Sequence, residues 1–143
     1  MAPPSDRFKP IQRLASHRER KAAAELGESL RTRDAARQRL GELEAYLAEY
    51  LERFAQATRS GLSGTQLLEY QVFINKLEAA IAQQRENVER TEQQCDSSKV
   101  QWQGRLTHAK AVDNAVGRMQ ADEQREQDKR EQSESDEFGQ RKR

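Results

Sequence analysis

The residues Arg59-Ser60-Gly61-Leu62-Ser63-Gly64-Thr65 separate two long segments with helical patterns, and the rest of the predicted fold follows from them. Gly61 suits the left-handed conformation that ends a helix, because glycine has no Cβ to clash. Ser63 and Gln66 have the spacing of a capping box, in which each side chain bonds the backbone N–H of the other residue. One helix is therefore predicted to end and a second to begin within this stretch.

A hydrophobic staple supports the same interpretation, since Leu62 and Leu67 fall at its two positions on either side of the cap. A flexible linker between unrelated helices would explain the glycines but not the cap and the staple. We therefore expect a tight turn at residues 60–65 and two helices that run antiparallel.

The composition favours a thin hydrophobic seam over a thick core. Only 34% of the 143 residues are hydrophobic and 34% are charged, against roughly 45–50% and 25% in ordinary globular domains. The net charge of +1 comes from interleaved acidic and basic residues, which argues against nucleic-acid binding. No apolar run is long enough for membrane insertion, and Cys95, the one cysteine, is consistent with a reducing cytoplasm.

All three prolines lie within the first ten residues, so no proline interrupts a helix after Pro10. Residues 1–9 are expected to be a flexible N-terminus, with the first helix beginning between Asp6 and Pro10 and running to about Ser60. Residues 10–119 are expected to form the hairpin. The charged segment 120–143 is either a helical extension held by opposite charges or a disordered tail.

The second helix carries the clearest periodicity in the chain. Steps of seven residues meet an apolar side chain each time, which is typical of a coiled coil: Leu67, Ile74, Ile81, Val88, Cys95, Trp102, Ala109 and Val116. The fold class predicted is all-α, a long two-helix antiparallel coiled coil (an α-hairpin) with an overhanging C-terminal helix. Trp102 is expected to fill a gap in this seam or, alternatively, to be exposed for a partner.

Pairing Leu47 with Ile74 across the turn also brings Leu40 opposite Ile81. In this register a second apolar stripe flanks the seam on each helix, and the two stripes adjoin because equivalent flanks of antiparallel helices face the same side. The stripes form one patch, here called the aromatic surface, which Arg39 and Gln84 bound at its far end; its members are Leu43, Tyr46, Tyr50, Phe73, Leu77 and Ala80.

Two interpretations of the aromatic surface remain open. Its residues either widen the seam, with tyrosine hydroxyls in water, or form an exposed binding surface, since contiguous apolar patches usually mark partners and tyrosine is a favoured hot-spot residue.

No catalytic, cofactor or metal site is expected. His17 and His108 lack further ligands, Cys95 has no activating base, and no phosphate-binding glycine loop occurs. A thin hairpin also offers no water-excluding pocket in which to shift the pKa of a carboxylate. The chain is therefore predicted not to be an enzyme.

Three segments resemble the flagellar export protein FliJ family: Leu40-Gly-Glu-Leu-Glu-Ala-Tyr46-Leu-Ala-Glu-Tyr50, Tyr70-Gln-Val-Phe73-Ile-Asn-Lys-Leu77-Glu-Ala-Ala80-Ile81, and Asp136-Glu-Phe-Gly-Gln-Arg141. The resemblance implies a cytoplasmic component of the flagellar type III export apparatus, similar in fold to the stalk subunit of rotary ATPases and associated peripherally with the inner membrane at the flagellar base. The partners it implies are the export ATPase hexamer, the cytoplasmic domain of the transmembrane export-gate protein, and export chaperones.

The resemblance also implies that the gate-binding residues are those of the aromatic surface, with Arg39 and Gln84 at its edge. Arg39 stands where the family has glutamine and Gln84 where it has histidine. Two alternatives are an equivalent stalk protein of a virulence type III secretion system and a generic coiled-coil scaffold.

Overall fold

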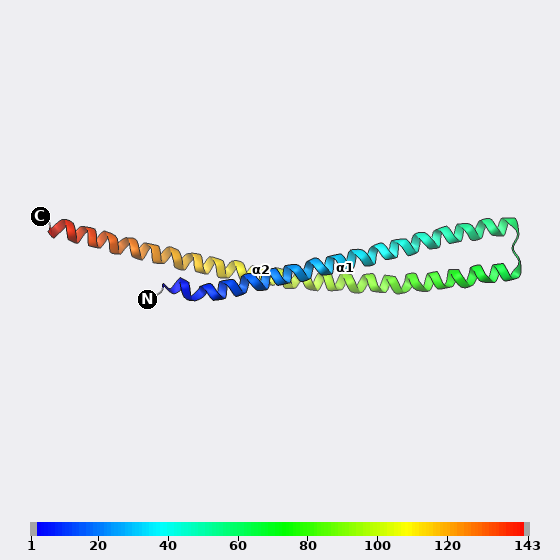
Figure 1. Cartoon of the computed structure of the whole chain (residues 1–143), viewed down its shortest axis with the longest axis horizontal. Helices are drawn as coiled ribbons and strands as arrows, with labels where there is room; N and C mark the ends of the chain where they lie inside the picture. Colours follow the sequence, from blue (N-terminus) through cyan, green and yellow to red (C-terminus); the bar gives the residue numbers. More distant parts are fainter. Residues whose placement is uncertain (1–2, 142–143) are drawn as a thin grey trace. The chain divides into compact units, whose positions relative to one another are not determined.

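The computed structural model describes residues 3–141, and within them there are two α-helices and no strand. Helix α1 spans Pro4–Ser60 and helix α2 spans Gly64–Arg141, joined by residues 61–63 (Figure 1). The two helices pack against each other as an antiparallel hairpin, which confirms the predicted all-α fold class.

Two compact units make up the hairpin. The turn unit, Glu25–Lys99, contains the end of α1, the turn and the start of α2. The terminal unit contains the described residues up to Ala24 and from Val100 onward.

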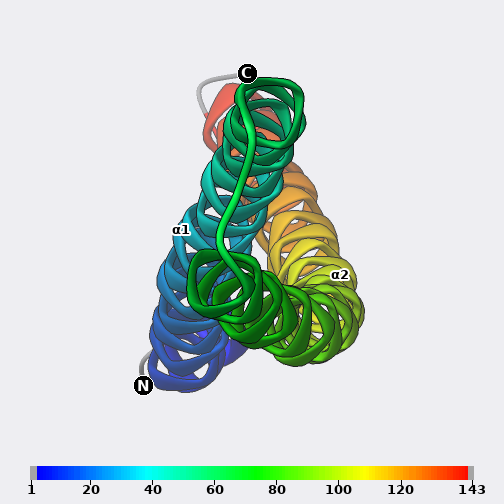
Figure 2. The same cartoon turned by 90° about the vertical axis from the view of Figure 1, so that its right-hand side faces the viewer.

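The turn has the predicted chemistry. Gly61 has a φ of 96°, and its N–H donates to the carbonyl of Thr58 at 3.3 Å. The capping box is complete, because the Ser63 N–H donates to Gln66 Oε1 at 3.1 Å and the Gln66 N–H donates to Ser63 Oγ at 3.2 Å. Figure 2 shows this end of the hairpin, where the connecting residues pass directly from α1 to α2. The turn thus ends one helix and starts the next without leaving these backbone N–H groups unpaired.

Burial follows the predicted heptads of α2. Ile81, Cys95 and Val116 are buried, and Leu77 and Ser98 are buried at the second heptad position. On α1 the buried hydrophobic residues are all alanines, spaced by seven residues or a multiple of seven: Ala15, Ala22 and Ala36. Because alanine side chains are small, few large apolar side chains lie between the two helices at these positions, and the helices can pack closely.

A hydroxyl pair lies in the seam of the turn unit. Ser29 continues the heptad position of Ala22 and Ala36, and its Oγ lies 2.8 Å from Ser98 Oγ. Ser98 is buried, so this hydrogen bond satisfies a polar group that would otherwise be costly to bury.

Helix α1 begins at Pro4, earlier than the sequence predicted. The reason lies on α2: Glu123 accepts the backbone N–H of Ser5 at 2.8 Å and its hydroxyl at 2.7 Å. This carboxylate caps the first turn of α1 from the facing helix, where a negative charge also suits the helix dipole. Of the predicted N-terminal segment 1–9, residues 1 and 2 lie outside the described residues.

The charged C-terminal segment is helical as far as Arg141, which is the first of the two alternatives predicted for it. Every residue from 124 to 141 is exposed. Hydrogen bonds one turn apart support the helix, including Gln124 to Asp128 at 3.0 Å and Gln127 to Glu131 at 3.1 Å. Residues 142 and 143 of the predicted extension lie outside the described residues.

Candidate protein-binding surface

Five aromatic rings from both helices form a connected cluster in the turn unit. Tyr50 is central: its ring centroid lies 4.4 Å from that of Phe73, 5.3 Å from Tyr70 and 6.4 Å from Tyr46. Tyr46 also meets Phe73 edge-on at 6.0 Å, and Phe54 lies 5.3 Å from Tyr70. These separations are within the range in which aromatic pairs attract one another beyond simple burial. The predicted neighbours Tyr50 and Phe73 are therefore in contact, as the register requires.

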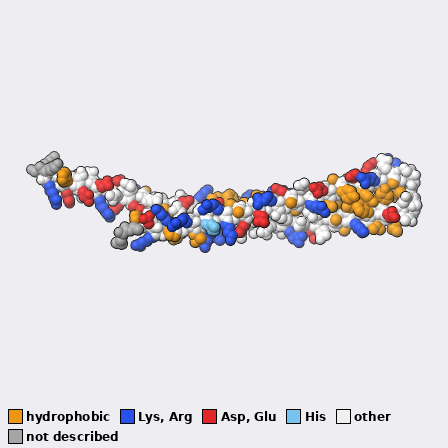
Figure 3. Space-filling model, in the orientation of Figure 1, with side chains coloured by type: hydrophobic (Ala, Val, Ile, Leu, Met, Phe, Trp, Pro, Cys, Tyr) orange, Lys and Arg blue, Asp and Glu red, His pale blue; other side chains and the backbone are white. Residues whose placement is uncertain are grey.

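The side chains of the aromatic surface differ in how much of their area is exposed to solvent. Leu77 is 7% exposed, whereas Tyr46 is 42% exposed. Leu43, Tyr50, Phe73 and Ala80 are half-buried. Hydrophobic side chains, drawn in orange, gather near the turn on the face shown in Figure 3. The structure thus contains features of both interpretations, with a base packed into the seam and an outer aromatic rim.

For Leu77 the structure agrees with the first interpretation, in which the residue widens the seam. Leu77 lies at the second heptad position of α2 and belongs to the seam, because a two-helix seam uses two positions per heptad. Leu43 and Tyr50 likewise continue the heptad position of the buried Ala36, which explains why they are only half exposed. Sequence periodicity alone did not separate the second seam position from the flank, since both lie within about 100° on a helical projection.

Arg39 and Gln84 lie together at the far end of the aromatic surface, as predicted. They line a groove of about 330 Å³ with Leu43, Ala80, Gln83, Asn87 and Arg90. Arg39 is exposed, whereas Gln84 is half-buried and its amide donates to the backbone carbonyl of Ala36 at 3.0 Å. Gln84 therefore ties the two helices together, and this bond uses one of its two amide N–H groups.

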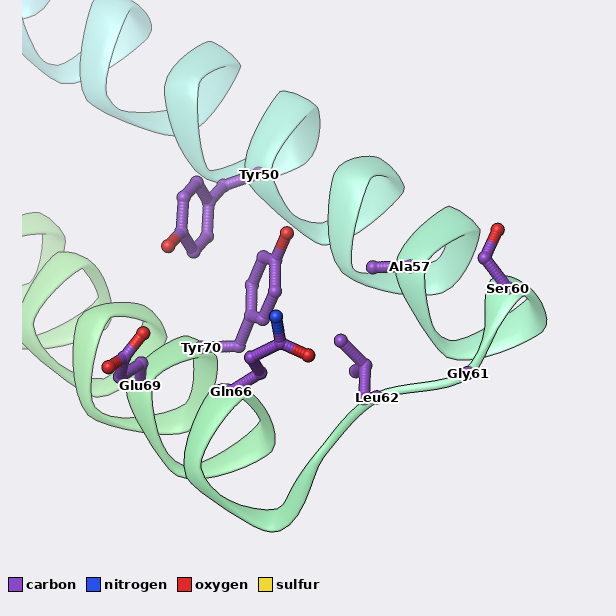
Figure 4. A pocket seen from close by; sticks show the side chains of 8 residues that line it. All are labelled: Tyr50, Ala57, Ser60, Gly61, Leu62, Gln66, Glu69 and Tyr70. Atoms are coloured by element: carbon purple, nitrogen blue, oxygen red, sulfur yellow. The ribbon is translucent and has the colours of Figure 1, made fainter.

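A groove of about 430 Å³ continues the aromatic cluster toward the turn (Figure 4). Tyr50 of α1 and Tyr70 of α2 lie close together on one side of it, and Leu62 points from the turn toward Ala57. Phe54 and Tyr70 also belong to this cluster, although they lie outside the predicted aromatic surface. Leu67 is 39% exposed, and its staple with Leu62 stays a prediction.

A third groove in the turn unit has a more apolar lining than the other two. Its volume is about 260 Å³, and it is lined by Glu44, Leu47, Ala48, Leu51, Glu78, Ile81 and Arg85. An ion pair of 3.3 Å between Arg85 and Glu44 connects the helices there. This apolar groove shares no lining residue with the groove at Arg39, and the sequence did not indicate it.

Arginine–carboxylate pairs lie in the middle of the turn unit, both between the helices and within α1. Arg37 pairs with Glu92 at 2.8 Å, and both side chains are largely exposed. Within α1, the hydrogen bond from Arg33 to Asp34 raises the pKa of the Arg33 guanidinium, which carries its charge at physiological pH in any case. Such exposed pairs contribute little to stability individually.

Trp102 lies in the terminal unit and is half-buried. Its indole N–H donates to Glu19 Oε1 at 3.0 Å across the helices. Trp102 therefore combines a seam position with a polar bond to the facing helix, which neither prediction for it had included.

Within residues 3–141, no group of three or more histidine, cysteine, aspartate or glutamate side chains could hold a metal ion. Nor does either helix, over the same residues, contain a stretch long and apolar enough to span a membrane.

Comparison with known proteins gives one family. The sequence model of a protein family described as "Flagellar FliJ protein" matches residues 4–142, which is nearly the entire chain. No curated protein and no solved structure matches the chain.

Proposed function

The chain belongs to the flagellar FliJ protein family, and from this premise we propose that it is the stalk and adaptor of the flagellar export apparatus. Membership of this family makes the chain a coiled-coil component of flagellar protein export. Beyond that, we propose that it enters the centre of the export ATPase hexamer, binds the cytoplasmic domain of the export-gate protein and escorts export chaperones. In these roles it works in the cytoplasm, beside the inner membrane at the flagellar base.

The observation that carries gate binding is the aromatic surface. Tyr46 exposes 42% of its area beside Tyr50 and Phe73, so an aromatic side chain from one helix meets an aromatic pair spanning both. Clustered aromatic side chains that are partly exposed are the usual anchors of protein interfaces. A binding surface built from two helices also depends on the register that the turn sets, which suits an adaptor that recognises its partner in one orientation.

Gate binding is tested with the double variant Tyr46→Ala, Phe73→Ala. We expect it to abolish binding to the gate domain in a pull-down while helicity remains nearly unchanged. The matched control is Leu68→Ala, Val72→Ala, which removes two hydrophobic side chains that are 60% and 46% exposed on α2 outside the aromatic surface. Equal loss of binding in the control would contradict a role specific to the aromatic surface.

The stalk role is supported by the terminal unit. Phe8, Ile11 and Leu14 follow one another along α1 and are 37%, 47% and 47% exposed. Exposed apolar side chains at helical spacing suit insertion into a protein channel. Separate pull-downs with the ATPase and the gate domain test this role: Ile11→Ser, Leu14→Ser should lose the ATPase and keep the gate domain. Loss of both partners would instead indicate a damaged hairpin.

A further inference from the structure

We infer that the partner on the aromatic surface places an acidic side chain in the groove at its far end, between Arg39 of α1 and Arg90 of α2. This groove, here called the arginine groove, is the one of about 330 Å³ described above. The inference rests on the proposed gate binding and adds the chemistry of the partner: an apolar segment that carries a carboxylate beside it.

The arginine groove is continuous with the aromatic surface. Leu43 and Ala80 belong to both, and they are half-buried side chains contributed by different helices. A partner segment that covers Tyr46 and continues along the hairpin away from the turn therefore reaches the groove directly. Its apolar residues would contact Leu43 and Ala80, and its next polar residue would face the arginines.

The two arginines have no acidic partner among the residues that the structure describes. Arg90 makes one long hydrogen bond, from Nη2 to Asn87 Oδ1 at 3.4 Å. Glu86, one turn before Arg90, forms no ion pair with it. By contrast, Arg37 and Arg85 each pair with a glutamate of the facing helix. Two guanidinium groups are therefore available at one groove.

The lining selects a carboxylate. A guanidinium presents a planar set of donors that matches a carboxylate in two-point contact. Gln83 and Asn87 add side-chain amides to the same lining, while the amide of Gln84 is already bound to the carbonyl of Ala36. The apolar part of the lining and the net charge of +1 do not suit a nucleic acid, which needs a longer basic face. An acidic side chain on a protein is the ligand that fits.

The test measures the affinity of the full-length chain for the gate domain at several salt concentrations. The variant Arg39→Gln, Arg90→Gln should bind about tenfold more weakly at low salt, since each exposed charge pair contributes a few-fold. Its affinity should also depend less on salt than that of the wild type, because the attraction it has lost is the one that salt screens.

A matched pair of charge reversals separates the arginine groove from general charge effects. Arg90→Glu and Lys76→Glu change the charge equally at exposed positions of α2, and Lys76 lies outside the groove. We expect Arg90→Glu to weaken binding at least tenfold and Lys76→Glu to change it less than about twofold. Circular dichroism of each variant confirms that the hairpin is intact.

The outcomes distinguish the inference from the function on which it rests. If Tyr46→Ala, Phe73→Ala abolishes binding but the arginine variants bind like the wild type at every salt concentration, the inference is wrong and gate binding stands. If the wild-type chain does not bind the gate domain, the proposed gate binding is wrong and the inference fails with it. Equal effects of Arg90→Glu and Lys76→Glu would also overturn the arginine groove.

Discussion

Replacing Tyr46 with alanine tests whether this side chain serves mainly to bind a partner or mainly to stabilise the hairpin. Tyr46 is 42% exposed and touches the rings of Tyr50 and Phe73 at 6.4 and 6.0 Å. Truncating a fully buried aromatic residue costs about 3–5 kcal/mol. Because Tyr46 leaves much of its area in solvent and stands at the rim of the cluster, we expect its loss to lower the free energy of unfolding by only about 1–2 kcal/mol.

Binding should suffer more than stability. An aromatic anchor at the centre of an interface is worth about 2 kcal/mol or more when truncated, which corresponds to a roughly 30-fold increase in Kd. The control is Leu51→Ala, because Leu51 has the same 42% exposure, also lies on α1 and is outside the aromatic surface. We expect Leu51→Ala to cost about 1 kcal/mol of stability and to leave binding nearly unchanged.

Two measurements on each variant decide the question. Denaturant unfolding followed by circular dichroism gives the change in stability, and titration calorimetry against the gate domain gives the change in Kd. The reasoning is refuted if Tyr46→Ala lowers stability by more than about 3 kcal/mol, the value for a core residue, or if both variants weaken binding equally. The first result would make Tyr46 part of the seam, and the second would make the effect unspecific.

Three further variants test how the hairpin is held together. Two alanines inserted into α1 just before Gly61 should preserve helicity by circular dichroism but abolish gate binding, because they rotate the α1 stripe away from that of α2; unchanged binding would show the register argument to be wrong. Glu123→Ala should speed amide exchange in the first turn of α1 and cost about 0.5–2 kcal/mol, the usual value of a helix cap, whereas exchange as slow as in the wild type would mean that Glu123 does not cap Ser5. Ser29→Ala alone should cost about 1–3 kcal/mol because it strands the buried Ser98 hydroxyl, while the double change to alanine should be closer to neutral; additive costs in a double-mutant cycle would contradict the hydroxyl pair.

The turn and the α2 seam could be predicted from the sequence because their signals are local. A glycine with positive φ and a capping box act within a few residues, and both are present at Gly61 and Ser63. The heptads of α2 repeat over a long stretch, and their buried members, such as Ile81 and Val116, lie where the repeat predicts. The contact between Tyr50 and Phe73 then followed from pairing two local patterns through one turn.

The start of α1 could not be predicted in the same way. Residues near Pro4 carry weak local signals, and the cap that stabilises this turn comes from Glu123, far along the chain. The bond from Trp102 to Glu19 and the bond from Gln84 to the carbonyl of Ala36 have the same origin. Each joins two groups whose separation in sequence gives no sign that they meet.

Turn chemistry and heptad spacing are properties of neighbouring residues. For that reason the helical hairpin, the position of its turn and the end that carries the aromatic residues could all be predicted from the sequence. The exposure of each side chain, by contrast, depended on the tertiary structure: Leu77 entered the seam, Tyr46 stayed at the rim, and Arg39 and Arg90 came to line the same groove. Exposure depends on the rotation of each helix about its axis. That rotation is set by close packing between the helices, down to the small residues of α1, and by polar bonds across the seam.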